Sequence, residues 1–185
     1  MLTGIRTSTP SIVAQETALD LLLGCHQRIR HFTAMARRLA ESPAAPLDEV
    51  CDAADGVYRY FSIALPLHEA DENDSIEPRL KATGNEEVAQ TAEKMLDQHR
   101  EINLVLKQLL PLWDALCREP EKLPGFVPRL LQLITQLEQL WNAHFNLEEE
   151  FVFPAMQRVL SRAELAEILY EMKERRGING TLKAG

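Results

Sequence analysis

Apolar residues recur every three or four positions in four long segments of the chain, which predicts four amphipathic helices. The predicted helices lie at about residues 13–41, from residue 47 past Glu72, at 85–117, and from about 130 to 156. Four long helices with short connections favour an all-α, antiparallel up-down-up-down four-helix bundle over residues 13–156. We expect the whole chain, residues 1–185, to form a single domain.

The predicted connections contain residues that interrupt helices. Two prolines lie in residues 42–46, residues 73–85 carry Pro78 and Gly84, and residues 118–128 hold three prolines and a glycine. Pro66 lies inside the second predicted helix, where it removes a backbone donor and clashes with the preceding turn. We therefore expect a kink or a local irregularity at this point.

A short fifth helix is predicted after the bundle, at residues 162–176. Ser161 and Glu164 have the spacing of a capping box, in which each side chain bonds the other residue's backbone N–H. Gly177 stands where a helix can end in a left-handed conformation.

The apolar face of each of the four predicted long helices contains a histidine. The predicted inward faces comprise Leu19, Leu22, Leu23, His26, Ile29, Ala36 and Ala40; Val57, Phe61, Leu65, His68 and Glu72; Ala92, Leu96, His99, Ile102, Leu106, Leu109 and Trp113; and Leu130, Ile134, Leu137, Trp141, His144, Glu148 and Phe151. His31 falls on a different face of the first helix, so we expect it at the surface.

Composition and charge narrow the possible partners. The chain has 20 basic and 28 acidic residues and a formal net charge of -8, which disfavours binding to nucleic acid or anionic membranes. No apolar run reaches the length of a membrane span or, near the N-terminus, of a signal peptide. The three cysteines, Cys25, Cys51 and Cys117, lack the spacing of a disulfide framework. These features together predict a cytoplasmic protein.

The histidines also reveal an internal repeat. His26 is followed 42 residues later by His68-x-x-x-Glu72, and His99 is followed 45 residues later by His144-x-x-x-Glu148. A proline, Pro78 or Pro154, stands ten residues after the histidine of each H-x-x-x-E motif. The first and second pairs of predicted helices therefore repeat the same pattern, a His on one helix and an H-x-x-x-E motif on the next.

This spacing predicts a metal site, because residues four apart on a helix project from the same face. The candidate ligands are His26, His68, Glu72, His99, His144 and Glu148. Six inward ligands exceed the needs of one tetrahedral zinc and suit two ions that share the carboxylates. The mixture of imidazole and carboxylate favours iron, with manganese and zinc as competitors.

Other interpretations of these residues are more ordinary. A lone histidine on an apolar face is usually a hydrogen-bonded core residue, and one H-x-x-x-E motif is weak evidence; the repeat favours metal. Cys25 does not share a face with its neighbour His26, which favours a buried structural thiol. The acids beside the ligands either orient the imidazoles or are solvated, and both interpretations stay open for Glu69, Asp71, Glu149 and Glu150.

With these motifs, residues 14–156 resemble the hemerythrin-like, or HHE cation-binding, family. The resemblance implies two iron ions with bridging carboxylates, an oxo or hydroxo bridge and an open coordination position. Oxygen-carrying hemerythrins have a further His at the position of Asn103, so the six-ligand set is more similar to that of the di-iron proteins that repair iron-sulfur clusters. Those usually carry a short cysteine-bearing N-terminal domain, which we do not expect in the few residues before the first predicted helix.

The leading functional hypothesis is a non-haem di-iron protein that senses, binds or detoxifies oxygen, nitric oxide or peroxide. One alternative is donation of iron to damaged iron-sulfur clusters, with a cluster-bearing client protein as partner. Another is a signalling module that responds to metal or redox state without catalysis. No nucleophile motif, phosphate loop or dinucleotide fingerprint supports a hydrolase, kinase or dehydrogenase.

Overall fold

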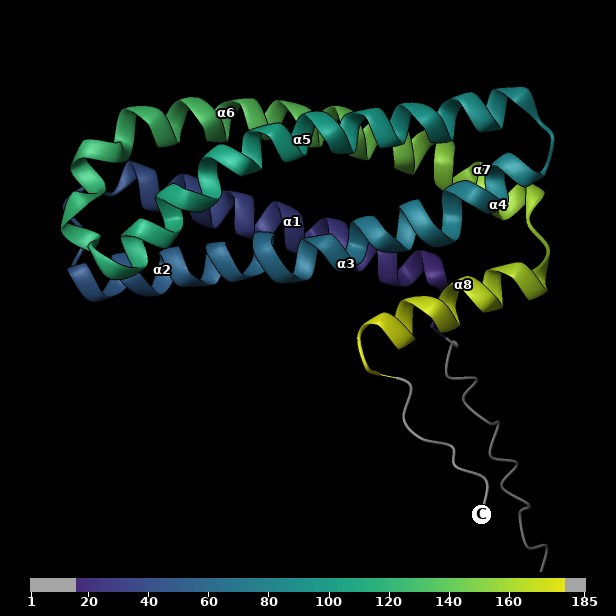
Figure 1. Ribbon diagram of the computed structural model, residues 1–185, viewed down its shortest axis with the longest axis horizontal. Coiled ribbons are helices and arrows are strands. Elements are labelled where there is room, and N and C mark those ends of the chain that lie inside the picture. The colour runs from purple at the N-terminus through teal and green to yellow at the C-terminus, as the bar shows by residue number, and fades with distance from the viewer. Residues whose placement is uncertain (1–15, 179–185) are drawn as a thin grey trace, which may run out of the picture.

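Four helical rods lie side by side along the long axis of the molecule, and a shorter helix lies against them near one end (Figure 1). The computed structural model describes residues 16–178. The rods are α1 (Ala18–Glu41); α2 (Leu47–Arg59), η1 (Tyr60–Ala64), α3 (Leu65–Ala70), η2 (Asp71–Ile76) and α4 (Glu77–Ala82); α5 (Glu86–Arg118); and η3 (Pro120–Lys122), α6 (Leu123–Leu147), η4 (Glu148–Val152) and α7 (Phe153–Val159). The shorter helix is α8 (Arg162–Arg175). Turns of π-helix form η1, η2 and η4, and η3 is a 3-10 turn.

The rods form a four-cornered bundle in which the chain direction alternates. α1 packs against α2 and α6, and α5 packs against the same two helices from the opposite corner. Residues 16–178 contain no strand. The predicted all-α, antiparallel four-helix bundle with a C-terminal helix is therefore confirmed.

Among residues 16–178, two of the three helices with a side-chain N-cap begin where predicted. Asn85 accepts a hydrogen bond from the Val88 N–H at 3.2 Å, so α5 begins where predicted. Ser161 and Glu164 form the predicted capping box at the start of α8. α1 begins at Ala18, because Thr17 caps it. The prediction of helix before that point is wrong for residues 16–17, and residues 13–15 lie outside the described residues.

The second rod is longer than predicted. We expected residues 73–85 to form a connection, but the helix continues through Pro78 to Ala82. The π-helical η2 ends at Ile76, two residues before this proline, and the wider turn lets a residue without an N–H enter the rod. Pro66 follows η1 in the same way, which confirms the expected irregularity.

The fourth rod also begins earlier than predicted. α6 starts at Leu123, inside the segment that we expected to be a connection. Pro124 lies in its first turn, where a missing N–H leaves no helical bond unmade. Proline content alone therefore overstated the length of this connection.

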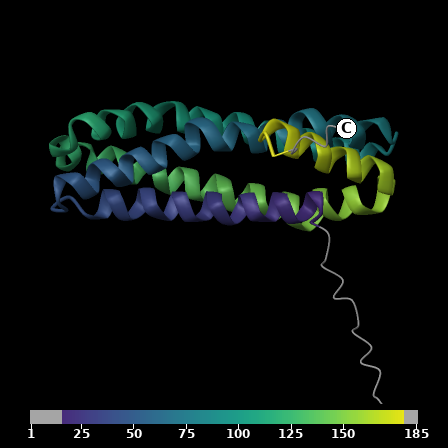
Figure 2. The same cartoon turned by 90° about the horizontal axis from the view of Figure 1, so that it is seen from below.

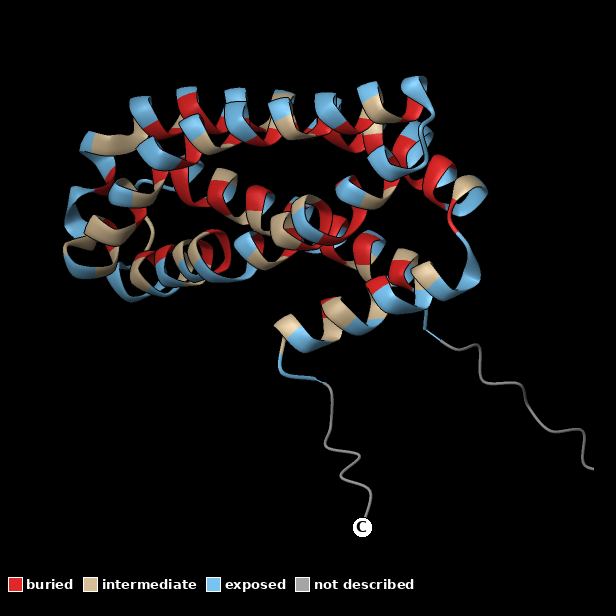
Figure 3. Cartoon of the chain, turned by 45° about the vertical axis from the view of Figure 1, so that its right-hand side comes forward, coloured by how far each residue is buried: buried red, intermediate tan, exposed pale blue. Residues whose placement is uncertain are grey.

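The buried faces of the rods point at one another, and exposed residues cover the outside (Figure 3). Two predicted members of the inward faces are exposed instead, Leu23 by 36% and Phe151 by 58%. Phe151 lies in η4, where the π turn shifts the inward face so that the next residue, Val152, is buried. Among residues 16–178, no helix has the length and apolar character needed to cross a membrane.

Candidate metal centre

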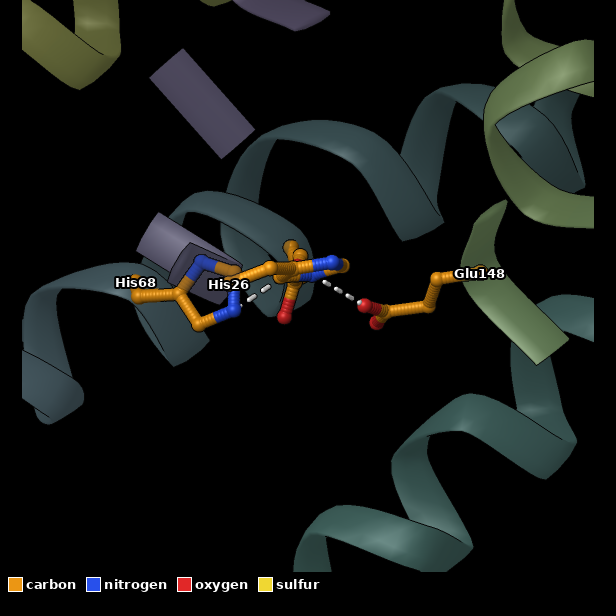
Figure 4. Close-up of side chains that lie close together, drawn as sticks. His26, His68 and Glu148 are labelled. Atoms are coloured by element: carbon orange, nitrogen blue, oxygen red, sulfur yellow. Dashed lines mark ion pairs between the residues drawn. The ribbon is translucent and has the colours of Figure 1, made fainter. Parts of the chain in front are cut away.

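All six predicted ligands lie together in the middle of the bundle and are buried. They form two overlapping groups: His26, His68, Glu72 and Glu148; and Glu72, His99, His144 and Glu148. Within each group, the candidate ligand atoms lie within 4.8 Å of one another. Figure 4 shows His26, His68 and Glu148 of the first group, with the Glu148 carboxylate reaching toward His26.

Each carboxylate lies between the two groups. Glu148 places Oε2 2.9 Å from Nε2 of His26 and Oε1 3.1 Å from Nε2 of His144. Glu72 places Oε1 3.3 Å from Nε2 of His68 and Oε2 3.1 Å from Nε2 of His99. Each glutamate thus divides its two oxygens between the groups, as a carboxylate that bridges two ions would.

The same local structure positions both glutamates. Glu72 and Glu148 stand at or near the start of a π-helical turn, one turn after the histidines of their H-x-x-x-E motifs. The backbone carbonyl of each glutamate accepts a hydrogen bond from the N–H five residues later, on Glu77 or Phe153. The next residue is a proline in both cases. The repeated proline of the sequence therefore marks the end of each π turn, and π turns are frequent at functional sites.

The central nitrogen and oxygen atoms fit a cation. Within residues 16–178, these atoms are buried and have no partner in hydrogen-bond geometry: Nε2 of His26, His68, His99 and His144, and both oxygens of Glu72 and Glu148. The neighbouring Nε2 and Oε atoms of this set lie about 3 Å apart, and all of them are directed at one shared centre. Buried polar atoms without partners are costly, and a bound cation satisfies them together.

Outer side chains orient three of the four imidazoles. Nδ1 of His26 donates to Glu149 at 2.7 Å, Nδ1 of His99 to Asn73 at 2.9 Å, and Nδ1 of His144 to Gln98 at 3.1 Å. Because each acceptor is an oxygen, the proton lies on Nδ1 and the Nε2 lone pair faces the centre. Nδ1 of His68 has no such partner among the described residues.

Burial governs the protonation of the centre. It lowers the pKa of His26 to about 4, against the opposing influence of Glu149, and lowers the pKa of His68 and His144 well below their usual value. These imidazoles are therefore neutral at neutral pH, the form that binds metal. For His99, burial also lowers the pKa, but the adjacent Glu72 outweighs it, so that the pKa is raised.

The pKa values of the two carboxylates shift in the other direction, upward. Burial raises the pKa of Glu148 well above its usual value, and the charge of Glu72 adds to this shift. Burial likewise raises the pKa of Glu72. A divalent cation reverses this balance, because it favours the ionised form of each carboxylate.

Three of the four flanking acids have structural partners. Glu149 also receives an ion pair from Arg30 at 2.9 Å, and Glu69 accepts hydrogen bonds from Asn103 at 3.0 and 3.2 Å. Asp71 is fully buried and is paired with arginines of the C-terminal segment. Glu150 is exposed.

Sequence reasoning missed two of the side chains that orient the imidazoles. Asn73 and Gln98 are each next to a candidate ligand in the chain, but uncharged amides at such positions give no signal in the sequence. The structure agrees with the other predictions near the site, because His31 is exposed and Cys25 is buried.

Part of the chain matches the model of a known protein family. The model of the hemerythrin HHE cation binding domain matches residues 17–123, which include His26, His68, Glu72 and His99. The chain belongs to this family. As an HHE protein, it contains a cation-binding domain, and the geometry adds His144 and Glu148 from beyond the matched residues. No match was found among curated proteins.

Proposed function

We propose that this HHE domain binds two iron ions through His26, His68, Glu72, His99, His144 and Glu148, and that it senses, binds or detoxifies a small oxidant. One observation carries the proposal: two groups of four buried donors share the carboxylates of Glu72 and Glu148. A single ion would leave donors of the other group without a partner.

The donor set supports iron as the first choice of metal. Each group combines two imidazoles with two carboxylates and contains no thiolate, a mixture that suits iron and is also accepted by manganese and zinc. Each ion would have fewer protein ligands than an octahedral site requires, which leaves room for a small molecule. When bound, iron would supply Lewis-acid and one-electron redox chemistry toward oxygen, nitric oxide or peroxide.

The chain itself supplies orientation and a dry environment. Phe145 and Phe153 lie against the His26 ring, with centroid distances of 4.5 and 5.3 Å. Apolar residues of every rod close the bundle on both sides of the donors. Charge interactions are stronger in such a site than in water, so the ligands hold a cation tightly.

Anaerobic loading tests the binding step of the proposal. Metal-free protein is mixed with ferrous iron, freed of excess metal and analysed for iron, with parallel samples in manganese and zinc. We expect about two irons per chain and weaker retention of the other metals. Less than one ion per chain with all three metals would contradict the proposal.

Spectroscopy of the loaded protein tests the oxidant. Oxygen, a nitric oxide donor and hydrogen peroxide are added separately, and the absorption spectrum is followed with time. A rapid change with at least one of them, absent in zinc-loaded protein, supports an oxidant-responsive centre. An unchanged spectrum with all three would leave the protein a binding domain without this reactivity.

A further inference from the structure

α8 lies outside the four-rod bundle, against one side of it near one end (Figure 1 and Figure 2). It packs against η2 and α1. Ile168 and Met172 anchor it through fully buried side chains. This helix lies beyond the residues that the family model matches.

The end of α8 reaches a buried carboxylate of η2. Arg175 contacts Oδ1 of Asp71 at 3.0 Å, and Arg176 contacts both oxygens of Asp71 at 2.5 and 3.1 Å. Asp71 is fully buried, so it depends on these two guanidinium groups for compensation of its charge. Ionic hydrogen bonds of this kind are among the stronger contacts in proteins.

A second part of the network ties the same two elements together. Arg175 donates to Oγ of Ser75 at 2.7 Å, and the Ser75 hydroxyl donates to Glu171 of α8. Arg79 binds both Glu171, at 2.8 Å, and the backbone carbonyl of Ser75, also at 2.8 Å. Side chains of η2 are thus held by α8 over a full turn, and Arg79 of α4 links the Ser75 carbonyl to Glu171 of α8.

The C-terminal cap of α8 sets the position of the two arginines. Gly177 has a φ of 65°, a left-handed conformation that side chains disfavour. Its N–H bonds the carbonyl of Glu174, and the Ile178 N–H bonds that of Lys173, both at 2.9 Å. These bonds form a Schellman motif, which ends the helix directly after Arg175 and Arg176.

η2 therefore has two sides with different partners. Asp71 faces α8, and the next residue, Glu72, faces the centre of the bundle and lies between both donor groups. Because the two residues are consecutive in one short π turn, a rotation or shift of that turn moves both. Metal ligands are commonly held in place by such outer contacts.

We infer that Arg175 and Arg176 are positioning residues for the metal centre, and that docking of α8 is coupled to metal binding at Glu72. The inference rests on the proposed function. Coupling between two sites is reciprocal, so the metal must stabilise the docked helix as much as the docked helix favours the metal. The position of α8 thus reports whether the centre is loaded.

Arg176→Ala is the central variant, and Lys173→Ala is its matched control. Lys173 lies on the same helix and pairs with the exposed Glu16 at 2.9 Å, so its replacement removes the same charge from α8 without removing a contact to η2. The quantity compared is the rise in melting temperature when metal-free protein is saturated with ferrous or zinc ions. A purely structural role lowers the melting temperatures of both forms and leaves this difference unchanged.

We expect a smaller metal-induced shift in Arg176→Ala and in the double variant Arg175→Ala/Arg176→Ala, corresponding to a roughly tenfold or greater loss of affinity. Arg176→Lys should restore part of the shift, and Lys173→Ala should match the wild type. If charge repulsion between the arginine and the metal governed binding, the metal-induced shift would instead be larger in Arg176→Ala, because removing a cation near the centre favours metal ions. An unchanged or larger shift in the Arg176 variants would overturn the inference.

Hydrogen exchange tests the reciprocal effect in the wild-type protein. Metal should slow the exchange of amides in α8, and this added protection should be lost in Arg176→Ala. Equal exchange in α8 with and without metal would also overturn the inference. Wild-type protein that takes up no metal would instead contradict the proposed function, so the two failures are distinguishable.

Discussion

We expect Glu148 to destabilise the metal-free protein and to stabilise the metal-bound protein. Its carboxylate is fully buried, and the raised pKa means that the folded state disfavours its ionised form. The unfolded chain ionises this group freely above its ordinary pKa of 4.5. The group therefore lowers the stability of the metal-free protein progressively as the pH rises above that value.

Glu148→Gln should separate these two effects. Glutamine does not ionise, so the free energy of unfolding of the metal-free variant should exceed that of the wild type by about 1–3 kcal/mol at neutral pH. The advantage should shrink as the pH falls toward the ordinary pKa. Urea unfolding at several pH values measures it, and metal analysis should show fewer than two ions. A variant that keeps both ions would contradict the bridging role.

His99 and His31 form a matched pair of histidines. His99 is buried beside Glu72, whereas His31 is exposed on α1. We expect His99→Ala to lose at least one metal ion per chain and His31→Ala to retain the wild-type content, as measured by elemental analysis after gel filtration. Equal metal content in the two variants would remove His99 from the ligand set.

At the level of elements, a π turn followed by proline is the unit that positions each candidate bridging glutamate, Glu72 and Glu148. In η4 the Phe153 N–H bonds the carbonyl of Glu148, and Pro154 supplies no N–H to the residue four before it. The proline thereby disfavours ordinary α-helical bonding at this point. The inward direction of the glutamate depends on this irregular turn.

Pro154→Ala should weaken metal binding although Pro154 is exposed and is not a ligand. Alanine restores a backbone donor and allows the turn to relax toward α geometry, which would displace Glu148. We expect a roughly tenfold loss of metal affinity by chelator competition, with equal or greater stability of the metal-free fold.

Pro111→Ala is the control for this variant, because Pro111 is exposed and lies within α5, a helix that no π turn interrupts. It should leave metal affinity unchanged. If both proline variants bind metal as the wild type does, the π turn does not depend on its proline.

Over the whole molecule, the centre separates two apolar clusters. The first includes Ile29, Leu65, Ile102 and Trp141, and the second includes Leu22, Ile76, Met95 and Val152. Along each rod the metal-ligating candidates fall between a member of one cluster and a member of the other. The bundle therefore contains a polar layer whose atoms have few partners without a cation.

Removal of metal should consequently lower the stability of the entire bundle. Saturation at about 100 to 1,000 times the dissociation constant contributes about 2.7–4.1 kcal/mol, which corresponds to roughly 5–15 °C in melting temperature for a chain of this size. Calorimetry of chelator-treated and reloaded protein measures the shift. The Glu148→Gln variant should show little of this metal-induced rise in melting temperature. A wild-type shift near zero would mean that the polar layer is stable without metal.

The sequence by itself determined the helical class, the capped starts at Asn85 and Ser161, and the burial of the six candidate ligands. These features follow from helical periodicity and from hydrogen bonds between residues a few positions apart. The metal-ligand role of the six residues stays a prediction that the geometry supports.

Only the tertiary structure decided which outer side chains hold the centre. Glu149 meets His26 across 123 positions of the chain, and Arg176 meets Asp71 across 105. No periodic pattern specifies such pairs, because they depend on how the rods pack around one another. The continuation of the second rod past Pro78 was unpredictable for a related reason, since a π turn leaves the composition unchanged and alters only the backbone bonding.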